Sequence, residues 1–266
     1  MSRKFDNSSG NYAVITGASS GIGKCLSLCL AKEGFDTVLI ARREDRLHSL
    51  ADLIRERYDR ESVVITADLS AEKECLELAE RLSGISYSVL VNCAGFGDCG
   101  AFTETDLSKD LAMIDVNIRA LHILTKSALR DLTERGSGYI LNVASSAGLM
   151  PAGPYMSVYY ATKAYVTSLT SAIERELKES NSSVYIGMLC PGPVDTEFND
   201  IANVRFSLKG ISPEECASYA IRKMKQKKTL IVPELSLRLA FFFGRFIPRR
   251  FYVRLVGLQQ SRKLGR

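Results

Sequence analysis

The sequence predicts an α/β protein built on a single doubly wound parallel sheet. Short apolar runs rich in β-branched residues alternate with longer amphipathic segments along the chain. Such alternation produces βαβ units, whose crossover helices cover both faces of a parallel sheet. The chain has 266 residues, 46% of them hydrophobic, which is enough to bury one large core. No linker rich in Pro, Gly or Ser interrupts the pattern.

The individual elements follow from this periodicity. The predicted strands are Tyr12–Thr16, Thr37–Ile40, Val63–Thr66, Val89–Asn92, Tyr139–Val143, Val184–Leu189 and Leu230–Val232. The predicted helices are 21–33, 44–58, 71–82, 106–134, 158–179 and 213–226. The last helix has a clear start signal, since Ser212 can cap it and Pro213 suits its first position.

Basic residues are concentrated at the C-terminus. Residues 235–266 contain eight Lys or Arg and no Asp or Glu, so of the 35 basic and 30 acidic residues in the chain, 27 and 30 remain elsewhere. The mildly acidic body argues against nucleic-acid binding and confines any anionic partner to the tail. We expect a cofactor-binding and catalytic domain over residues 1–233 and a basic, apolar helical extension over 234–266.

The cysteines and histidines favour neither a metal site nor a disulfide framework. Seven cysteines are scattered without ligand spacing, and His48 and His122 each stand alone in a predicted helix. The first ten residues are polar and do not resemble a secretory leader. We therefore expect free thiols, no bound metal and a cytoplasmic localisation.

A glycine-rich turn follows the first predicted strand and leads directly into a helix. It reads Thr16-Gly17-Ala18-Ser19-Ser20-Gly21-Ile22-Gly23. Glycines permit close approach of the backbone to a ligand, and the free N–H groups at a helix start attract a pyrophosphate. The spacing is G-x-x-x-G-x-G rather than the more familiar G-x-G-x-x-G, so this interpretation needs support from other motifs.

Two other interpretations fit the same turn. Gly17 to Gly21 also satisfies G-x-S-x-G, the nucleophile turn of serine hydrolases, with Ser19 as the nucleophile. That chemistry requires a histidine late in the chain, whereas His48 and His122 are both early and inside helices. A turn without any ligand is the remaining alternative.

The end of the second predicted strand indicates which dinucleotide is preferred. It reads Leu39-Ile40-Ala41-Arg42-Arg43. An acidic residue at this strand end binds the ribose 2′-hydroxyl of NAD, whereas arginine complements the 2′-phosphate of NADP. Ala41 stands where the acid would be, so the sequence predicts NADP(H), with Arg42 as first candidate and Arg43 as second. The alternative is a solvated strand end.

Tyr159 and Lys163 are the clearest candidates for chemistry. They stand four residues apart in a predicted helix and therefore share a face. A nearby ammonium favours phenolate over phenol, which makes tyrosine a usable acid and base. Such a pair is common by chance and on most helices is only a solvated face. Its position relative to the other motifs gives it weight.

The order of these motifs closely resembles that of the short-chain dehydrogenase/reductase family. The matching motifs are the glycine turn, Asn92-Cys93-Ala94-Gly95, Asn117, Ser146, Tyr159, Lys163 and Pro191-Gly192. The resemblance covers about residues 12–200 and implies a Rossmann-like domain that binds NADP(H) and interconverts a carbonyl and an alcohol. Cys93 departs from the asparagine often found there. A looser resemblance is to the bacterial subgroup related to hydroxysteroid dehydrogenases and 3-oxoacyl reductases.

The resemblance also implies a role for each matched residue. Tyr159 would transfer the proton, and Lys163 would lower the Tyr159 pKa and bind the nicotinamide ribose. Ser146, thirteen residues before the tyrosine and preferred over its neighbour, would polarise the substrate oxygen, while Asn117 would hold a relay water. The implied cofactor-binding residues are Gly17, Ser19, Ser20, Gly21, Ile22, Gly23, Arg42, Arg43, Asp68, Leu69, Asn92, Ala94, Gly95, Tyr159, Lys163, Pro191, Gly192, Val194 and Thr196. A cofactor-binding sensor without turnover is the alternative, but no catalytic position is altered.

The substrate and partners are predicted more coarsely. The expected substrate loop, 195–212, contributes Phe198, Ile201, Val204 and Phe206, which favours a lipophilic steroid, bile acid or 3-oxoacyl thioester over a sugar. The resemblance to the family implies a homodimer or homotetramer. The segment Leu235–Tyr252 is too short between charges to span a bilayer and suits an amphipathic helix at a membrane surface or on a partner. Packing against the domain itself or against a second subunit is the alternative.

Overall fold

The computed structural model describes residues 4–198, 202 and 210–263. In this part of the chain a parallel sheet runs in the order β3-β2-β1-β4-β5-β6-β7. Its strands are β1 (Tyr12–Thr16), β2 (Asp36–Ala41), β3 (Ser62–Thr66), β4 (Tyr87–Asn92), β5 (Gly138–Val143), β6 (Val184–Leu189) and β7 (Leu230–Ile231). The strand order reverses between β1 and β4, and ligands of open α/β sheets bind in the crevice at such a point.

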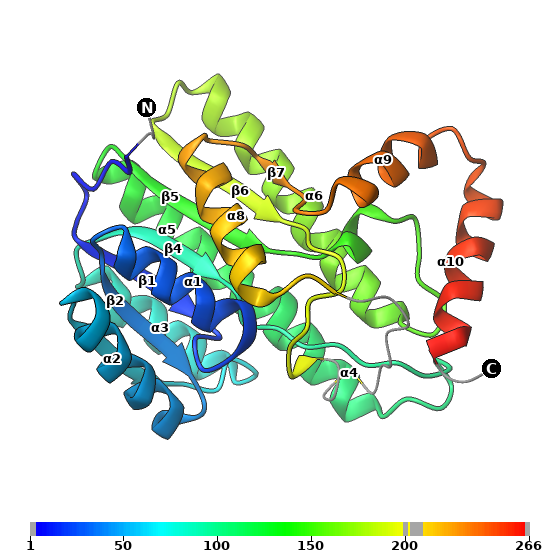
Figure 1. Cartoon of the computed structure of the whole chain (residues 1–266), viewed down its shortest axis with the longest axis horizontal. Coiled ribbons are helices and arrows are strands. Elements are labelled where there is room, and N and C mark those ends of the chain that lie inside the picture. Colours follow the sequence, from blue (N-terminus) through cyan, green and yellow to red (C-terminus); the bar gives the residue numbers. More distant parts are fainter. Residues whose placement is uncertain (1–3, 199–201, 203–209, 264–266) are drawn as a thin grey trace.

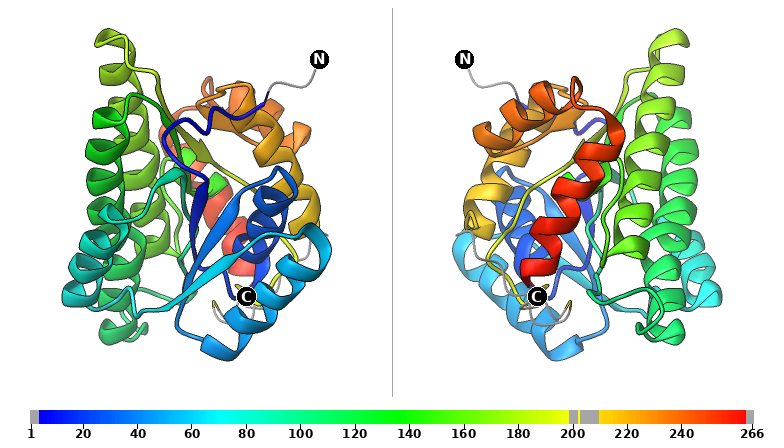
Figure 2. Two further views of the ribbon diagram at one scale, coloured as in Figure 1. Left: turned by 90° about the vertical axis from the view of Figure 1, so that its left-hand side faces the viewer. Right: turned by 90° about the vertical axis from the view of Figure 1, so that its right-hand side faces the viewer.

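Helices cover both faces of the sheet, as Figure 2 shows. One layer contains α1 (Gly21–Lys32), α2 (Glu44–Tyr58) and α8 (Pro213–Lys225), and the other contains α3 (Glu72–Ser83), α5 (Leu121–Glu134) and α6 (Ser157–Glu179). Each layer has its own apolar core against the sheet. β4, β5 and β6 are buried along their whole length, as expected for parallel strands covered on both faces. The predicted doubly wound fold is confirmed.

The predicted helix 106–134 is divided in the structure. It consists of α4 (Leu107–Ile114), a π-helical turn η1 (Asp115–Ala120) and α5. Apolar spacing cannot reveal such a turn, because one extra residue barely changes the periodicity. π-helical turns inside helices are frequent at functional sites, and this one contains Asn117.

The C-terminal extension forms two helices, α9 (Leu235–Gly244) and α10 (Arg249–Lys263), beyond the β7 edge of the sheet (Figure 1). A single helix over Leu235–Tyr252 is therefore wrong, since Pro248 lacks the N–H that a helix interior requires. Leu237 and Phe241 of α9 pack against a core cluster, and Val256 of α10 is buried. Packing against the domain is thus confirmed for one side of the extension. No helix in the described ranges is long and apolar enough to cross a membrane.

Candidate active site

A cavity of about 560 Å³ lies at the carboxyl ends of the strands. It extends from the glycine turn after β1, past the ends of β2 and β4, to the start of α6. Nearly all the predicted cofactor-binding residues line it. The predicted residues on its wall are Gly17, Ser19, Ser20, Gly21, Ile22, Gly23, Arg42, Arg43, Asp68, Leu69, Ala94, Gly95, Tyr159, Lys163, Pro191, Gly192, Val194 and Thr196.

The glycine turn has a backbone that other residues could not easily adopt. Gly17 and Gly21 have φ values of +68° and +51°, in the left-handed region. A Cβ at Gly23 would lie 2.2 Å from the Gly17 carbonyl oxygen, so side chains are excluded where α1 begins. The exposed start of α1 therefore offers unobstructed N–H groups to an anion, and the turn fits a pyrophosphate.

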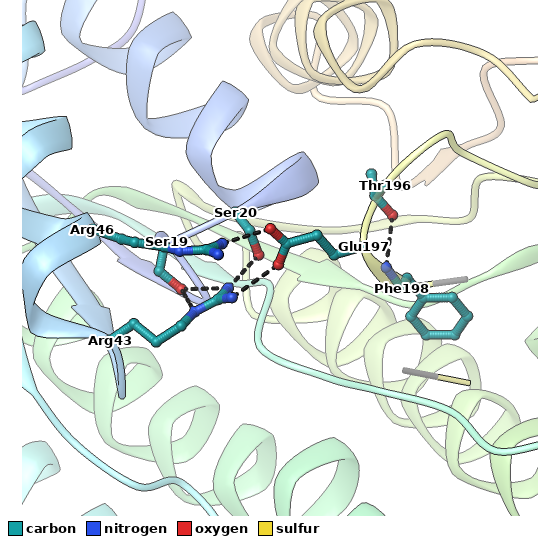
Figure 3. Close-up of polar contacts among 7 residues, drawn as sticks. All are labelled: Ser19, Ser20, Arg43, Arg46, Thr196, Glu197 and Phe198. Atoms are coloured by element: carbon teal, nitrogen blue, oxygen red, sulfur yellow. Dashed lines mark hydrogen bonds and ion pairs between the residues drawn. The ribbon is translucent and has the colours of Figure 1, made fainter. Parts of the chain in front are cut away.

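Two arginines lie at the end of β2, and their surroundings differ. Figure 3 shows Arg43 donating to the hydroxyls of Ser19 and Ser20 and pairing with Glu197 at 2.9 Å. Arg46 of α2 pairs with the same carboxylate, so Glu197 joins the segment after β6 to α2 across the glycine turn. Arg42 is exposed, lines the cavity and makes no hydrogen bond or ion pair within the described ranges. Its guanidinium is the freer of the two for a phosphate.

Asp68 and Leu69 follow β3 at the same end of the cavity. The Asp68 carboxylate accepts hydrogen bonds from the backbone N–H and hydroxyl of Ser70 at 3.0 and 2.9 Å. These bonds hold the pKa of Asp68 below its usual value. The carboxylate is therefore ionised and fixed at the cavity wall, where it can receive a hydrogen bond from an adenine amino group.

The segment after β4 forms the cavity floor, with one correction to the prediction. A Cβ at Gly95 would lie 2.8 Å from Asn117 Oδ1 and 3.3 Å from Lys163 Nζ, so glycine is needed there. Asn92 does not line the cavity. Its side chain is buried beneath the floor, where the amide nitrogen donates to Thr125 and Asn142. It supports the sheet, because it joins β4 to Asn142 of β5 and to Thr125 of α5.

Asn117 is anchored by protein groups on both sides. Its side-chain oxygen accepts from the Phe96 N–H at 3.1 Å, and its side-chain nitrogen donates to the Phe96 carbonyl and to Thr162 at 2.9 and 3.0 Å. The amide thereby joins the floor segment to α6. Since both N–H groups of the side chain are used, a relay water at this residue would have to bind an oxygen, either the backbone carbonyl or the side-chain oxygen.

Tyr159 and Lys163 both lie in the cavity wall on α6, and both are buried. Lys163 Nζ donates to the Val143 carbonyl at 2.9 Å and lies 5.9 Å from the centre of the Tyr159 ring. Burial lowers the pKa of Lys163 to about 8. Burial also raises the pKa of Tyr159 to about 12, so the net shift is opposite in direction to the lowering expected from Lys163. Desolvation is the largest influence on the phenol, because burial disfavours its charged form.

The structure brings Ser145, rather than Ser146, to the phenol. A hydrogen bond from Ser145 opposes the burial that raises the Tyr159 pKa. Ser145 has extended backbone angles and caps the short helix η2 (Ser146–Leu149). Ser146 begins that helix, and its backbone N–H donates to the Pro191 carbonyl at 2.8 Å. Both serines line the cavity, and the backbone changes from extended at Ser145 to helical at Ser146.

The cavity is also lined by residues that the motifs did not indicate, among them Glu197, Leu237 of α9 and Gln260 of α10. Gln260 is 2% exposed and donates to the Tyr160 hydroxyl at 2.6 Å. No sequence signal pointed to these residues, because α9 and α10 reach the cavity only through the tertiary fold. The expected loop residues Ile201, Val204 and Phe206 lie outside the described residues, whereas Phe198 packs against Tyr159.

The serine hydrolase alternative has no support from the site. The Ser19 hydroxyl accepts from Arg43 at 3.1 Å. His48 lies on the exposed side of α2 beside Glu44, and His122 pairs with Tyr165 between α5 and α6. Neither imidazole lines the cavity that contains Ser19. The interpretation fails because a nucleophilic serine needs a histidine within hydrogen-bond reach.

A phosphate-binding turn at the switch point of a doubly wound sheet, joined by one cavity to a buried tyrosine and lysine, defines a dinucleotide-dependent oxidoreductase. The family model for short chain dehydrogenases matches residues 11–204. The chain therefore belongs to the short-chain dehydrogenase family and is a nicotinamide-dependent oxidoreductase of alcohol and carbonyl groups.

Individual relatives agree with this assignment. A very-long-chain 3-oxoacyl-CoA reductase of Laccaria bicolor is 36% identical over 186 residues, which cover 68% of this chain and 55% of the relative. A short-chain dehydrogenase from Sphingobium yanoikuyae in complex with NADPH has a TM-score of 0.81 and 28% identity, covering 88% and 93% of the two chains. A structure from work on 7β-hydroxysteroid dehydrogenase stereoselectivity has a TM-score of 0.83 and 25% identity. The match covers 94% of this chain and 97% of that structure's chain.

Proposed function

We propose that this protein is an NADP(H)-dependent reductase of a lipophilic ketone. The observation that carries the proposal is the single cavity that joins the glycine turn and Arg42 at one end to Tyr159, Ser145 and Lys163 at the other. The NADPH complex of the Sphingobium relative supports the choice of cofactor. Gly17, Gly21 and Gly23 would bind the pyrophosphate, Arg42 the 2′-phosphate and Lys163 the nicotinamide ribose.

When bound, the nicotinamide supplies the hydride for carbonyl reduction. Tyr159 donates its phenolic proton to the carbonyl oxygen as negative charge develops there. Ser145 donates a second hydrogen bond to the same oxygen and so holds the carbonyl against Tyr159. Lys163 places a positive charge near the resulting phenolate. Ser146, the residue expected from the thirteen-residue spacing, is assigned no contact with substrate in this proposal.

Burial of Tyr159 suits its phenol to the role of proton donor in this proposal. With a pKa of about 12, the phenol keeps its proton at neutral pH, which is the form needed to donate to a carbonyl. Alcohol oxidation would require the phenolate, a minor species at neutral pH. Lys163, with a pKa of about 8, is still largely charged there. A protonated phenol beside a charged ammonium is the arrangement that proton donation to a carbonyl requires.

The substrate end of the cavity is apolar. Its wall includes Phe96, Met150, Met156, Tyr160 and Phe198. These side chains offer hydrophobic contacts and few hydrogen bonds, which suits a steroid, a bile acid or a long-chain 3-oxoacyl thioester better than a sugar. The 3-oxoacyl-CoA reductase and hydroxysteroid dehydrogenase relatives support the same classes.

Two partner predictions accompany this proposal. A homodimer or homotetramer would bury the exposed Leu107, Leu111 and Ile114 of α4. Peripheral membrane contact would involve the C-terminal extension, which begins at about residue 234.

The proposal is tested by following NADPH oxidation with steroid ketones, oxo bile acids, 3-oxoacyl thioesters and simple sugars. We expect turnover with one of the lipophilic classes and none with the sugars. The Arg42→Ala variant should raise the KM for NADPH by roughly 10- to 100-fold, because a charge-assisted contact to phosphate is lost, and leave the KM for NADH nearly unchanged. Arg55→Ala, an exposed α2 substitution outside the cavity, is the control. Equal losses with both cofactors would contradict the role of Arg42.

A further inference from the structure

The outer side of α9 and α10 carries an apolar surface that the rest of the described chain leaves uncovered. Leu235, Leu239, Phe242 and Phe246 recur at helical spacing along α9 and the turn after it, and are 49–72% exposed. On α10, a similar spacing is found for Phe251, Leu255 and Leu258, which are 53–62% exposed. Phe243 and Ile247 extend this C-terminal surface at the junction of the two helices. Contiguous exposed apolar side chains of this kind mark an interaction site.

Packing within the domain does not account for these side chains. The inward sides of the two helices are formed by a different set, with Leu237 and Phe241 on α9 and Val256 and Gln260 on α10. Each helix is therefore apolar on two sides, and only one of them meets the domain. The right-hand view of Figure 2 faces α10, which in Figure 1 lies at the opposite side of the molecule from α2.

The charges around the C-terminal surface are all of one sign. Arg238, Arg245, Arg249, Arg250 and Arg254 are exposed on the same two helices, and residues 235–266 contain no acidic residue. The guanidinium of Arg245 lies 4.3 Å from the centre of the Phe242 ring, so cations and aromatic rings are interleaved. This combination fits a surface that is negatively charged outside and apolar just beneath.

A second copy of the chain fits less well. A two-fold contact would place the same patch on both sides, so that arginines would face arginines without acidic partners. Nucleic acid would satisfy the arginines and leave the leucines, the isoleucine and most of the phenylalanines in water. An anionic lipid surface satisfies both sets.

We propose that α9 and α10 dock this protein on an anionic membrane, with the exposed phenylalanines inserted at the level of the acyl chains and the arginines at the headgroup phosphates. A second part of the inference concerns how the substrate reaches the cavity, and this part rests on the proposed function. The inward sides of the same helices line the cavity through Leu237 and Gln260, so docking brings the cavity wall to the lipid surface. A lipophilic ketone then reaches Tyr159 from the membrane.

Flotation of the full-length protein with vesicles tests the docking. Vesicles of phosphatidylcholine with about a third phosphatidylglycerol should carry the protein, and pure phosphatidylcholine vesicles should carry far less. Replacing Arg245, Arg249 and Arg250 together by glutamine should weaken partitioning by on the order of 100-fold, and added salt should weaken that of the wild type. Replacing Phe243, Phe246 and Phe251 together by serine should abolish it.

The matched control is the Leu76→Ser, Phe102→Ser double variant, which removes similarly exposed apolar side chains away from the extension and from α4. It should float like the wild type, and all variants should keep the wild-type Tm. Equal flotation with neutral and anionic vesicles would overturn the anionic-lipid assignment. Absence of flotation would also overturn it. A lower molecular mass in solution for the Phe243, Phe246, Phe251 serine variant than for the wild type would overturn it too, because it would identify the C-terminal surface as a contact between copies.

Delivery of the substrate is measured separately from docking. The serine variant should reduce a water-soluble ketone at the wild-type rate and a vesicle-dissolved ketone at least tenfold more slowly, since only the second route uses the membrane. Equal rates with the vesicle-dissolved ketone would overturn delivery from the membrane. If the wild type reduced no ketone at all, the proposed function would fail, delivery would fail with it, and flotation would still decide the docking.

Discussion

Replacing Tyr159 by phenylalanine should lower kcat for ketone reduction by roughly 10²- to 10⁴-fold, the range that a positioned general acid contributes. The variant keeps the ring that packs against Phe198 and loses only the hydroxyl. We therefore expect the melting temperature and the affinity for NADPH to change little. Steady-state kinetics with NADPH and a ketone accepted by the wild type measure the effect.

Tyr165→Phe is the matched control for this experiment. Tyr165 lies on the same helix six residues further along, and its hydroxyl contacts His122 rather than the cavity. Removing that hydroxyl should leave kcat within a small factor of the wild-type value. Near wild-type turnover by Tyr159→Phe would show that the proton comes from elsewhere, and the proposed mechanism would have to be abandoned.

Replacing Ser145 by alanine should lower kcat by roughly 10²- to 10³-fold, as the loss of one hydrogen-bond donor to a developing oxyanion does. The structure supports this residue because its hydroxyl counteracts the rise that burial causes in the pKa of Tyr159. The same change at Ser146 should have a far smaller effect, since that residue contributes its backbone N–H to Pro191, and alanine keeps the N–H. The two variants differ by one position and serve as controls for each other.

The measurement is kcat and KM for both serine variants with one ketone and saturating NADPH. Ser145→Ala should lose kcat more than it raises KM, because the hydrogen bond strengthens as charge develops on the oxygen. A large loss in Ser146→Ala together with normal turnover in Ser145→Ala would reverse the assignment. It would restore the residue that the thirteen-residue spacing predicts.

Much of the fold could be predicted because it depends on local patterns. Strand and helix periods differ, so β-branched runs such as Val184–Leu189 and amphipathic segments such as Glu44–Tyr58 are visible one at a time. Strict alternation then permits few arrangements other than a parallel sheet with right-handed crossovers. The π-helical turn at Asn117 escaped prediction because it inserts an irregularity without altering the apolar pattern.

The candidate site was partly predictable for a related reason. In a parallel sheet the segments that follow β1, β2 and β4 all meet at one edge, so the glycine turn, Arg42 and Gly95 had to lie near one another. The helical spacing of Tyr159 and Lys163 fixed their shared face. Whether Asn92 faced the cavity depended on which layer its side chain entered, and that is decided by strand register and packing.

The sequence by itself determined the doubly wound fold, the glycine turn, the pairing of Tyr159 with Lys163 and the basic character of the C-terminal extension. All of these depend on residues that are neighbours in the chain or on the ends of parallel strands. Only the tertiary structure decided that Ser145 meets the phenol, that burial raises the Tyr159 pKa, and that α9 and α10 form a wall of the cavity. Residue spacing counts positions along the chain, whereas side-chain direction and desolvation depend on backbone angles and on contacts between segments far apart in sequence.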